Sequence, residues 1–382
     1  KIGLNSGSIG IVAKGGLIEN RGIINSENIG VYGTTGTSAT EINHTGTLNI
    51  NSGTGIYLKD TGLSNTVLAN LNGGTIKVAL GVDDKSAVVA EERAKIVLNG
   101  TDITVNDSSN AIALMGDSGK KSTLEMKSGN IKIGSQGVGI YSKESDIFLD
   151  SGYTGTIELG EKSTGIYVDE KSNLSGTGTI NIKYVGTDKG TGIFYKEGIR
   201  DNKASVNSGA LNDNLINIYG ENLSLTNSAE QVVGKNGIGI YVAGTTSAPS
   251  IVTNNAELKL NGEGSMGIYA KDNTTITSLG TISGSNSKND KIGVFLDGGD
   301  ITGTLDYTFE VDGGIGIYMK KYMGYSGQMR LTGTSYNDGV NDYRAIGILV
   351  DKAAGTGTLA ANLEMSGANG IGIYLDSNNI SG

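Results

Sequence analysis

The chain has 382 residues, of which 62 are Gly, one is Pro and none is Cys or Trp. The lack of cysteine excludes disulfide frameworks and thiol chemistry, and so high a glycine content argues against helices. The formal net charge of −9 disfavours nucleic acid and anionic lipid as partners, because both would repel a negative surface. No run of residues is long and apolar enough to predict a transmembrane helix.

One short pattern recurs along the chain: Gly or Ala, then Ile or Val, and usually then Tyr. The mean spacing between copies is about 28 residues, a period typical of solenoids. A repeat under selection to stack on its own copies makes catalysis a less favoured function. The first residue of each copy is Gly10, Gly30, Gly55, Ala87, Ala111, Gly139, Gly165, Gly192, Gly239, Gly267, Gly293, Gly316, Gly347 or Gly372.

Each copy has the alternation of a β-strand, as the segment 238–242 shows. It reads Ile-Gly-Ile-Tyr-Val, and neighbouring side chains in a strand point to opposite faces. The residue after the Gly or Ala is β-branched in every copy, which suits a strand that stacks on identical strands. We therefore expect this column to line the inside of the coil. Its members are Ile11, Val31, Ile56, Val88, Ile112, Ile140, Ile166, Ile193, Ile240, Ile268, Val294, Ile317, Ile348 and Ile373.

A second strand is expected before many of the copies, because aliphatic residues there alternate with Asn, Lys or Glu. These strands lie at 47–50, 75–78, 130–133, 156–159, 179–182 and 257–260. A less regular third segment often lies between the two, as at 146–149. Two or three short strands in each period predict an all-β chain that forms a parallel β-helix of about 14 coils of roughly 28 residues.

The Gly column and the ring after it define the expected outer face. Gly could provide positive φ, but Ala87 and Ala111 also occupy the column, so we favour a steric role in which Gly and Tyr share the outer face and a ring covers a neighbouring Gly. A structural ladder is the simpler interpretation of the rings, and a stacking surface for sugars or a partner is the alternative. The rings are Tyr32, Tyr57, Tyr141, Tyr167, Phe194, Tyr241, Tyr269, Phe295, Tyr318 and Tyr374, interrupted by Val12, Val89, Ala113 and Leu349.

Two intervals depart from the period within what we expect to be one continuous unit, 1–382. The long interval after Gly192 predicts either a divergent coil at 215–219 or a polar loop insertion at 196–214. The interval after Gly316 predicts an insertion at 321–344 that is rich in Tyr and Arg. Insertions in repeat proteins often lie on the binding face, and Tyr and Arg are frequent in interfaces. The candidate ligand-binding residues are Tyr322, Tyr325, Arg330, Tyr336 and Tyr343.

The residues that could carry catalysis or bind metal form no recognisable motif. His44 is the only histidine and is expected to be an exposed turn residue. The acidic pairs 83–84, 91–92 and 169–170 are expected to be solvated. We therefore predict no catalytic residue, no metal site and no cofactor. A β-helical polysaccharide lyase or hydrolase is the alternative, and it would need clustered carboxylates over one face.

The repeat itself resembles a known family. Gly-Ile-Tyr strands continue into Lys, Asp or Glu at 55–59, 165–170 and 267–272, and they recur with Gly-Thr-Ile strands at 155–157 and 178–180. Over the whole chain this resembles the passenger region of the large fusobacterial type V (Va) autotransporter adhesins. The resemblance implies a right-handed parallel β-helix. It also implies secretion through an outer-membrane β-barrel missing beyond the C-terminus, and display at the cell surface of a Gram-negative bacterium.

These observations lead to three hypotheses about function. The first is a non-catalytic, monomeric adhesin segment, a fragment of a longer passenger, whose partners are a host cell-surface receptor, a glycan or the surface of another bacterium. Such attachment would contribute to virulence, and the membrane would be involved only through the missing barrel. The second is the polysaccharide-degrading enzyme. The third is a purely structural stalk with the binding site elsewhere.

Overall fold

The computed structural model describes residues 2–375 except 4–6, 63–65, 80–84, 118, 210–213, 285–290, 303–305, 322–324, 338–341, 354–358 and 368. Within this part of the chain the regular secondary structure is all β. A search of the same residues for a helix that could cross a membrane finds none. The chain divides into two compact units, unit 1 (Lys1–Phe194) and unit 2 (Tyr195–Gly382).

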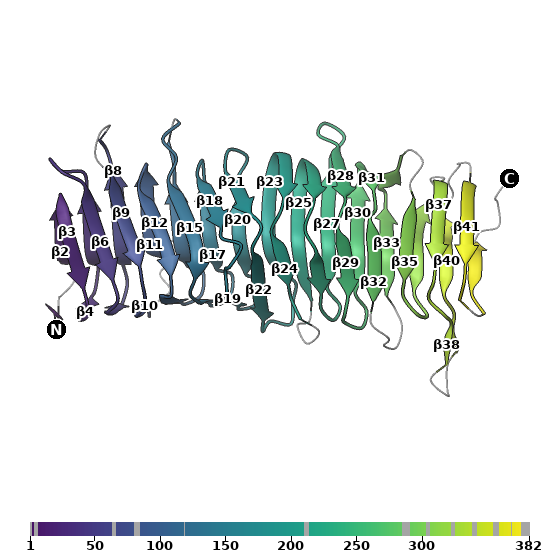
Figure 1. Ribbon diagram of the computed structural model, residues 1–382, viewed down its shortest axis with the longest axis horizontal. Helices are drawn as coiled ribbons and strands as arrows, with labels where there is room; N and C mark the ends of the chain where they lie inside the picture. The colour runs from purple at the N-terminus through teal and green to yellow at the C-terminus, as the bar shows by residue number, and fades with distance from the viewer. Residues whose placement is uncertain are drawn as a thin grey trace. The chain divides into compact units, whose positions relative to one another are not determined.

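Unit 1 is a parallel β-helix in which successive turns of the chain add strands to three sheets (Figure 1). Sheet A contains β1 (Ile2–Gly3), β4 (Ile23–Ser26), β7 (Thr47–Ile50), β10 (Thr75–Val78), β13 (Asp102–Val105), β16 (Ile131–Ile133), β19 (Thr156–Leu159) and β22 (Thr179–Tyr184). Sheet B contains β2 (Ile9–Lys14), β5 (Ile29–Thr34), β8 (Thr54–Asp60), β11 (Ser86–Glu92), β14 (Asn110–Met115), β17 (Val138–Lys143) and β20 (Thr164–Val168). Sheet C contains β3 (Gly16–Asn20), β6 (Thr40–His44), β9 (Val67–Leu71), β12 (Lys95–Asn99), β15 (Thr123–Ser128), β18 (Asp146–Leu149) and β21 (Asn173–Gly176).

Unit 2 has the same three-sided arrangement, and the strand β23 (Gly190–Asn202) spans the boundary between the units. Its sheet A contains β24 (Ser205–Asn207), β26 (Gln231–Val233), β29 (Glu257–Leu260), β32 (Thr281–Gly284), β35 (Tyr307–Glu310), β37 (Tyr325–Leu331) and β41 (Leu359–Met365). Its sheet B contains the first part of β25 (Leu215–Asn227), with β27 (Ile238–Gly244), β30 (Met266–Asp272), β33 (Ile292–Asp297), β36 (Ile315–Lys321), β40 (Ile346–Ala353) and β42 (Ile371–Leu375). Its sheet C contains the second part of β25, with β28 (Ser250–Asn254), β31 (Thr274–Ser278) and β34 (Asp300–Ile301). The predicted fold class, a parallel β-helix, is confirmed.

The predicted column of branched aliphatics forms the core of each unit. In unit 1 Ile56 pairs in register with Val31 on one side and Val88 on the other, and in unit 2 Ile268 pairs with Ile240 in the same way. All five side chains have no exposed surface. Burying each is worth up to about 2 kcal/mol, and only a neighbouring coil can provide that burial.

The Gly column has a steric role, but the predicted direction was wrong. A Cβ on Gly139 would lie 2.4 Å from the carbonyl oxygen of Gly165 on the next rung and 2.9 Å from Cδ1 of the core residue Ile133. Gly139 therefore faces inward, like Ile140 beside it, and its φ is not positive. Val138 and Ile140 both pair with residues of the next strand, β20, and the register of this pairing leaves out Gly139. The rings consequently do not share a face with the Gly column.

The long interval after Gly192 contains a divergent coil. Ile218 pairs with Ile240 and Tyr219 with Tyr241, so 215–219 belongs to sheet B of unit 2. The segment 196–214 is not the single loop that the sequence predicted, because its residues 196–202 continue β23 and β24 follows directly. Glu197 and Gly198, both with positive φ, let β23 bend without ending.

The insertion predicted at 321–344 is only partly irregular. β37 occupies much of it and pairs in parallel with β35 and β41 in sheet A. Beyond it, β38 (Tyr336–Asn337) and β39 (Asp342–Tyr343) form an antiparallel pair, which projects from the sheets of unit 2 in Figure 1. The projecting element is therefore this short hairpin and not the whole segment.

Candidate contact groove

The rings of the outer column stack on one another along sheet B. In unit 2 the ring centroids of Tyr219 and Tyr241 are 4.9 Å apart, and those of Phe295 and Tyr318 are 4.7 Å apart. These distances match the spacing of about 4.8 Å between paired strands, so each rung places its ring against the next. The pairs found are Tyr32–Tyr57, Tyr141–Tyr167 and Tyr167–Phe194 in unit 1, and Tyr219–Tyr241, Tyr241–Tyr269, Tyr269–Phe295 and Phe295–Tyr318 in unit 2. We call each stack a ring ladder.

The ring ladder of unit 1 is interrupted on two successive rungs. In register, Tyr57 pairs with Val89, Val89 with Ala113, and Ala113 with Tyr141. Two small side chains thus stand where the repeat elsewhere has rings. Three rung spacings of about 4.8 Å place the backbone positions of the two tyrosines about 14 Å apart.

A groove of about 610 Å³ occupies this interruption. Val89 and Ala113 form its floor, and the half-buried rings of Tyr57 and Tyr141 stand at its two ends. Its lining residues are Thr54, Tyr57, Lys85, Ser86, Val89, Glu91, Ser108, Ser109, Asn110, Ala113, Met115, Gln136, Val138 and Tyr141. The groove combines an apolar floor, aromatic ends and polar rims, which is the usual composition of a ligand site.

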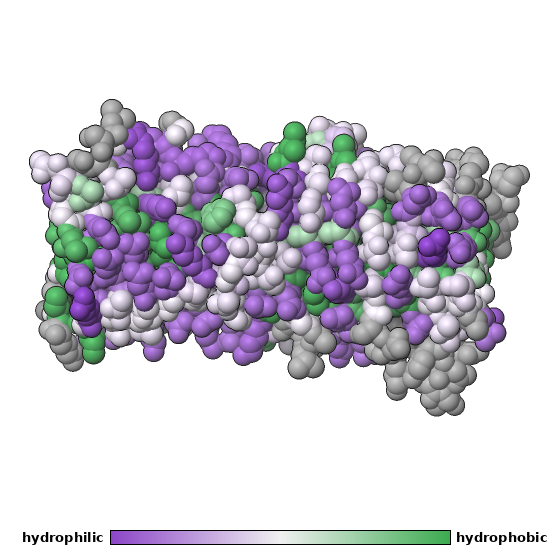
Figure 2. Space-filling model, in the orientation of Figure 1, coloured by the Kyte–Doolittle hydropathy of each residue, from purple (hydrophilic) through white to green (hydrophobic). Residues whose placement is uncertain are grey.

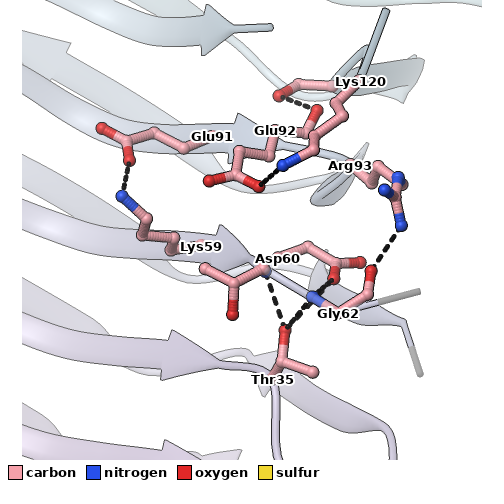
Figure 3. A network of polar contacts seen from close by, with 10 residues as sticks. Thr35, Lys59, Asp60, Gly62, Glu91, Glu92, Arg93 and Lys120 are labelled. Carbon is pink, nitrogen blue, oxygen red and sulfur yellow. Dashed lines mark hydrogen bonds and ion pairs between the residues drawn. The ribbon is translucent and has the colours of Figure 1, made fainter. Parts of the chain in front are cut away.

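One rim of the groove carries a neutralised charge. Lys59 on β8 and Glu91 on β11 point toward one another, with Nζ 3.1 Å from the carboxylate oxygen (Figure 3). Burial raises the pKa of Tyr57, and its hydrogen bond to Glu91 raises it further, so the phenol stays protonated. Glu91 therefore pairs with the Lys59 ammonium and lies close enough to Tyr57 to raise the pKa of its hydroxyl.

The same arrangement anchors the ring ladder of unit 2. The hydroxyl of Tyr269 donates to Asp297 on the next rung at 2.6 Å, and Nζ of Lys320 lies 2.8 Å from the same carboxylate. Tyr318 donates likewise to Asp351 at 3.0 Å. In both cases the acid lies on the next rung, two residues after the position of the outer column. It accepts a hydrogen bond from the phenol of the rung before it.

Adjacent acids in unit 1 have separate partners. Glu92 pairs with Lys120 at 2.9 Å, while Glu91 pairs with Lys59 (Figure 3). Asp169 accepts hydrogen bonds from the backbone amides of Glu144 and Lys171, each at 3.1 Å. The pair 83–84 lies outside the described residues. Across the described part of the chain, no three His, Cys, Asp or Glu residues are grouped closely enough to hold a metal ion.

Of the five candidate ligand-binding residues, Tyr325 and Arg330 have side chains that the structure describes, and these two do not lie on one surface. Tyr325 is buried in sheet A, and burial raises its pKa to about 12. Arg330 is exposed and pairs with Glu364 at 3.1 Å. The backbones of Tyr336 and Tyr343 pair across the hairpin. Tyr322 lies outside the described residues. The prediction of Tyr325 as a surface contact was therefore wrong.

His44 is not the exposed turn residue that the sequence suggested. It ends β6 with no exposed surface, and its Nδ1 lies 3.0 Å from Nδ2 of Asn20 on the preceding coil. Burial lowers the pKa of His44 to about 4, and a backbone contact with Thr75 offsets part of that shift. His44 is a neutral core residue at physiological pH.

Unit 2 carries a chain of buried asparagines at the equivalent corner, where strands of sheet C end. Asn202 donates to the side-chain oxygen of Asn227, and Asn227 donates to that of Asn254, each at 2.8 Å. Each also donates to the carbonyl two residues ahead, at Ala204, Ala229 or Ala256. These bonds satisfy buried polar groups at a corner where the backbone leaves the sheet.

Comparisons with known proteins leave the family open. No protein-family model matches the chain, and a search of curated proteins returns no match.

Proposed function

We propose that the chain is a non-catalytic segment of a surface-displayed autotransporter passenger that attaches a Gram-negative bacterium to host cells or to other bacteria. It acts outside the cell as a monomer, and its partner is a receptor, a glycan or another bacterial surface. The resemblance of the repeat to fusobacterial adhesins motivates the proposal. The observation that carries it is the groove at Val89 and Ala113, an open recess with aromatic ends where two successive rungs lack a ring.

The surface chemistry is compatible with contact between cells. On the face drawn in Figure 2, hydrophilic residues cover much of both units. Smaller hydrophobic patches are scattered among these hydrophilic residues. In the charged pairs along the strands, such as Lys132 with Glu158 at 2.7 Å, the lysine is largely solvent-exposed and the acid is partly exposed. Such pairs keep the surface hydrated and add little stability, so a recess lined by rings offers more binding energy than the rest of the sheet.

A purely structural stalk is the second candidate. The continuous ring ladder from Tyr219 to Tyr318 in unit 2 favours it, because rings that cover one another have little free face for a ligand. A stalk needs only this stacking, and binding would then lie elsewhere.

Adhesion of beads separates the two candidates. Beads coated with the 382-residue chain should adhere to epithelial cells or to partner bacteria more than uncoated beads do. Filling the groove with the double variant Val89→Tyr/Ala113→Tyr should reduce adhesion, whereas Tyr336→Ser/Tyr343→Ser tests the hairpin separately. Beads that do not adhere to any cell would support the stalk and contradict the proposal.

A further inference from the structure

Three consecutive rungs of unit 2 carry tyrosine in the outer column. Tyr219, Tyr241 and Tyr269 pair in register, and the ring centroids are 4.9 Å apart at both steps. The interplanar angles are 7° and 20°, and all three rings are half-buried. An electron can pass between rings in such contact, and Tyr241 is the neighbour of both others. We call these three residues the tyrosine triad.

The two outer phenols of the tyrosine triad each donate a hydrogen bond to a carboxylate. Tyr219 donates to Glu221 at 2.7 Å, and Tyr269 donates to Asp297 at 2.6 Å. Burial raises the pKa of both phenols and these hydrogen bonds raise it further, so both are protonated at neutral pH. A phenol becomes a strong acid when it loses an electron, and the bonded carboxylate is then in place to take its proton.

The charges around the middle ring favour loss of an electron. Burial raises the pKa of Tyr241, and three nearby carboxylates raise it further, those of Asp272, Asp297 and Glu221. Lys320 pairs with Asp297 and offsets part of this charge. Negative charge that disfavours a phenolate also stabilises the positive charge of a ring that has lost an electron. Tyr241 is therefore suited to donate an electron to an oxidised neighbour.

The chain lacks the side chains that compete most with tyrosine for a one-electron oxidant. It contains no Cys and no Trp. On the rung after the tyrosine triad, Phe295 stacks on Tyr269 with the centroids 4.9 Å apart. A phenyl ring is much harder to oxidise than a phenol, so a radical in the triad does not pass along the ladder beyond Tyr269.

We infer that the tyrosine triad is a site of oxidative cross-linking, at which a one-electron oxidant joins Tyr241 to Tyr219 or to Tyr269 through a carbon–carbon bond between the rings. Two molecules of oxidant each take one electron from a phenol. The proton goes to Glu221 or Asp297 from an outer ring and to water from Tyr241. The two phenoxyl radicals couple at carbons ortho to their oxygens. The hydrogen on each coupled carbon then moves to the oxygen of its ring, so the net loss is two electrons and two protons.

The cross-link fastens one coil to the next in a chain that has no cysteine for a disulfide. The inference stands apart from the proposed function, because it needs only the tyrosine triad and an oxidant. Like a disulfide, a bond between two rungs restricts the unfolded chain. The cross-linked protein should therefore unfold at a higher urea concentration than the untreated protein.

Oxidation of the full chain by a ruthenium(III) tris-bipyridyl complex, generated with light and persulfate, tests the inference. A dilute sample keeps the reaction within one molecule, which a denaturing gel verifies. Trypsin then separates the three rings, because Lys235 and Lys259 lie between them in the sequence. We expect the peptide of Tyr241 to be joined to that of Tyr219 or Tyr269, with a mass below the sum of the two by that of two hydrogen atoms.

Replacing tyrosine with phenylalanine removes the phenol and keeps the ring, as Phe295 does naturally in the same column. Tyr241→Phe should lose both links, whereas Tyr219→Phe and Tyr269→Phe should each lose one link and keep the other. The matched control is Tyr318→Phe, which removes a phenol on the far side of Phe295. This variant should form both links at the yield of the wild type.

The two acids are tested by Glu221→Gln/Asp297→Asn, which keeps all three phenols. An amide is a far weaker base than a carboxylate, so this variant should cross-link more slowly than the wild type. Three results would overturn the inference: no link between the peptides of the tyrosine triad, a link of Tyr241 to a tyrosine outside the triad at equal yield, or equal rates for the wild type and the acid variant.

Discussion

The hydroxyl of Tyr269 and the carboxylate of Asp297 lie 2.6 Å apart on neighbouring rungs, so the ring ladder of unit 2 is tied from one coil to the next by a hydrogen bond. Lys320 on the following rung holds the same carboxylate. Stacking alone fixes the spacing of the rings, and this bond also fixes their direction. At the groove, Glu91 has the same position relative to Tyr57, where it raises the pKa of the hydroxyl and pairs with Lys59.

Asp297 should make stability depend on pH in the acid range. Partial burial raises the pKa of Asp297, but hydrogen bonds from Lys320 and Tyr269 outweigh it and lower the pKa below its ordinary value of 3.8. Because the folded-state pKa is depressed, the stabilisation is present above pH 4 and is lost as pH falls through the folded value. The urea midpoint of Asp297→Asn should lie below that of the wild type at pH 7 and approach it at pH 2. A constant difference at both pH values would contradict this role.

His44 should also make the stability of the fold depend on pH, at less acidic pH than Asp297 does. Its folded pKa of about 4 lies below the ordinary value of 6.5, so the unfolded chain binds the proton more readily. Stability should therefore fall as pH decreases from about 6.5 to about 4, by about 3 kcal/mol in total. His44→Asn, which introduces the residue that unit 2 uses at this corner, should remove that dependence. The check is the urea midpoint of both proteins between pH 4 and pH 7, and parallel curves would refute the assignment.

The buried asparagine chain should be sensitive to truncation. Asn227→Ala removes the bonds to Asn202 and Asn254 and leaves buried polar groups without them. Each group left unsatisfied costs about 1–3 kcal/mol. Asn255→Ala is the matched control, because that side chain is exposed on the adjacent rung. Thermal unfolding should show a large loss of stability for Asn227→Ala and almost none for Asn255→Ala. Equal losses would mean that the hydrogen bonds between the buried asparagines do not stabilise the fold.

The inward-facing glycines should not tolerate a methyl group. Gly139→Ala would place a Cβ 2.4 Å from the carbonyl oxygen of Gly165, which belongs to the rigid backbone of the next rung. We expect a loss of about 1–3 kcal/mol, as for other overpacked cores. Gly22→Ala is the control, because nothing lies within 4 Å of its added Cβ. If chemical denaturation ranks the two variants equally, the close packing of the Gly column is wrong.

Much of the fold could be predicted because it follows from a period of two repeated along the chain. Ile240 and Tyr241 alternate faces wherever the copy occurs, so the inner wall and the outer rings were both predictable. The inward direction of Gly139 could not be predicted, because the strand pairing leaves out this residue and interrupts the alternation of faces. The sequence does not reveal the interruption, since glycine is compatible with either face.

The burial of His44 and of Tyr325 follows from the alternation of their strands. His44 stands in step with Thr40 and Ile42, two buried positions of the same strand, and Tyr325 stands in step with Met329 and Leu331. Polar identity suggested exposure, whereas position in the alternation determined burial. The groove had a signal as well, in the two consecutive rungs that lack a ring. What it could bind depends on rim residues from several coils, whose proximity the sequence alone does not give.

Cross-linking across the groove floor tests the register most directly. The chain contains no native cysteine, so Val89→Cys/Ala113→Cys introduces the only thiols, on paired rungs about 4.8 Å apart, within the range that a disulfide spans. Val89→Cys/Tyr141→Cys places them two rungs apart, about 10 Å, beyond that range. The register of the paired strands predicts rapid intramolecular disulfide formation in the first variant and none in the second. No disulfide in the first, or a disulfide in the second, would contradict the stacking of the coils on which the ring ladder and its groove depend.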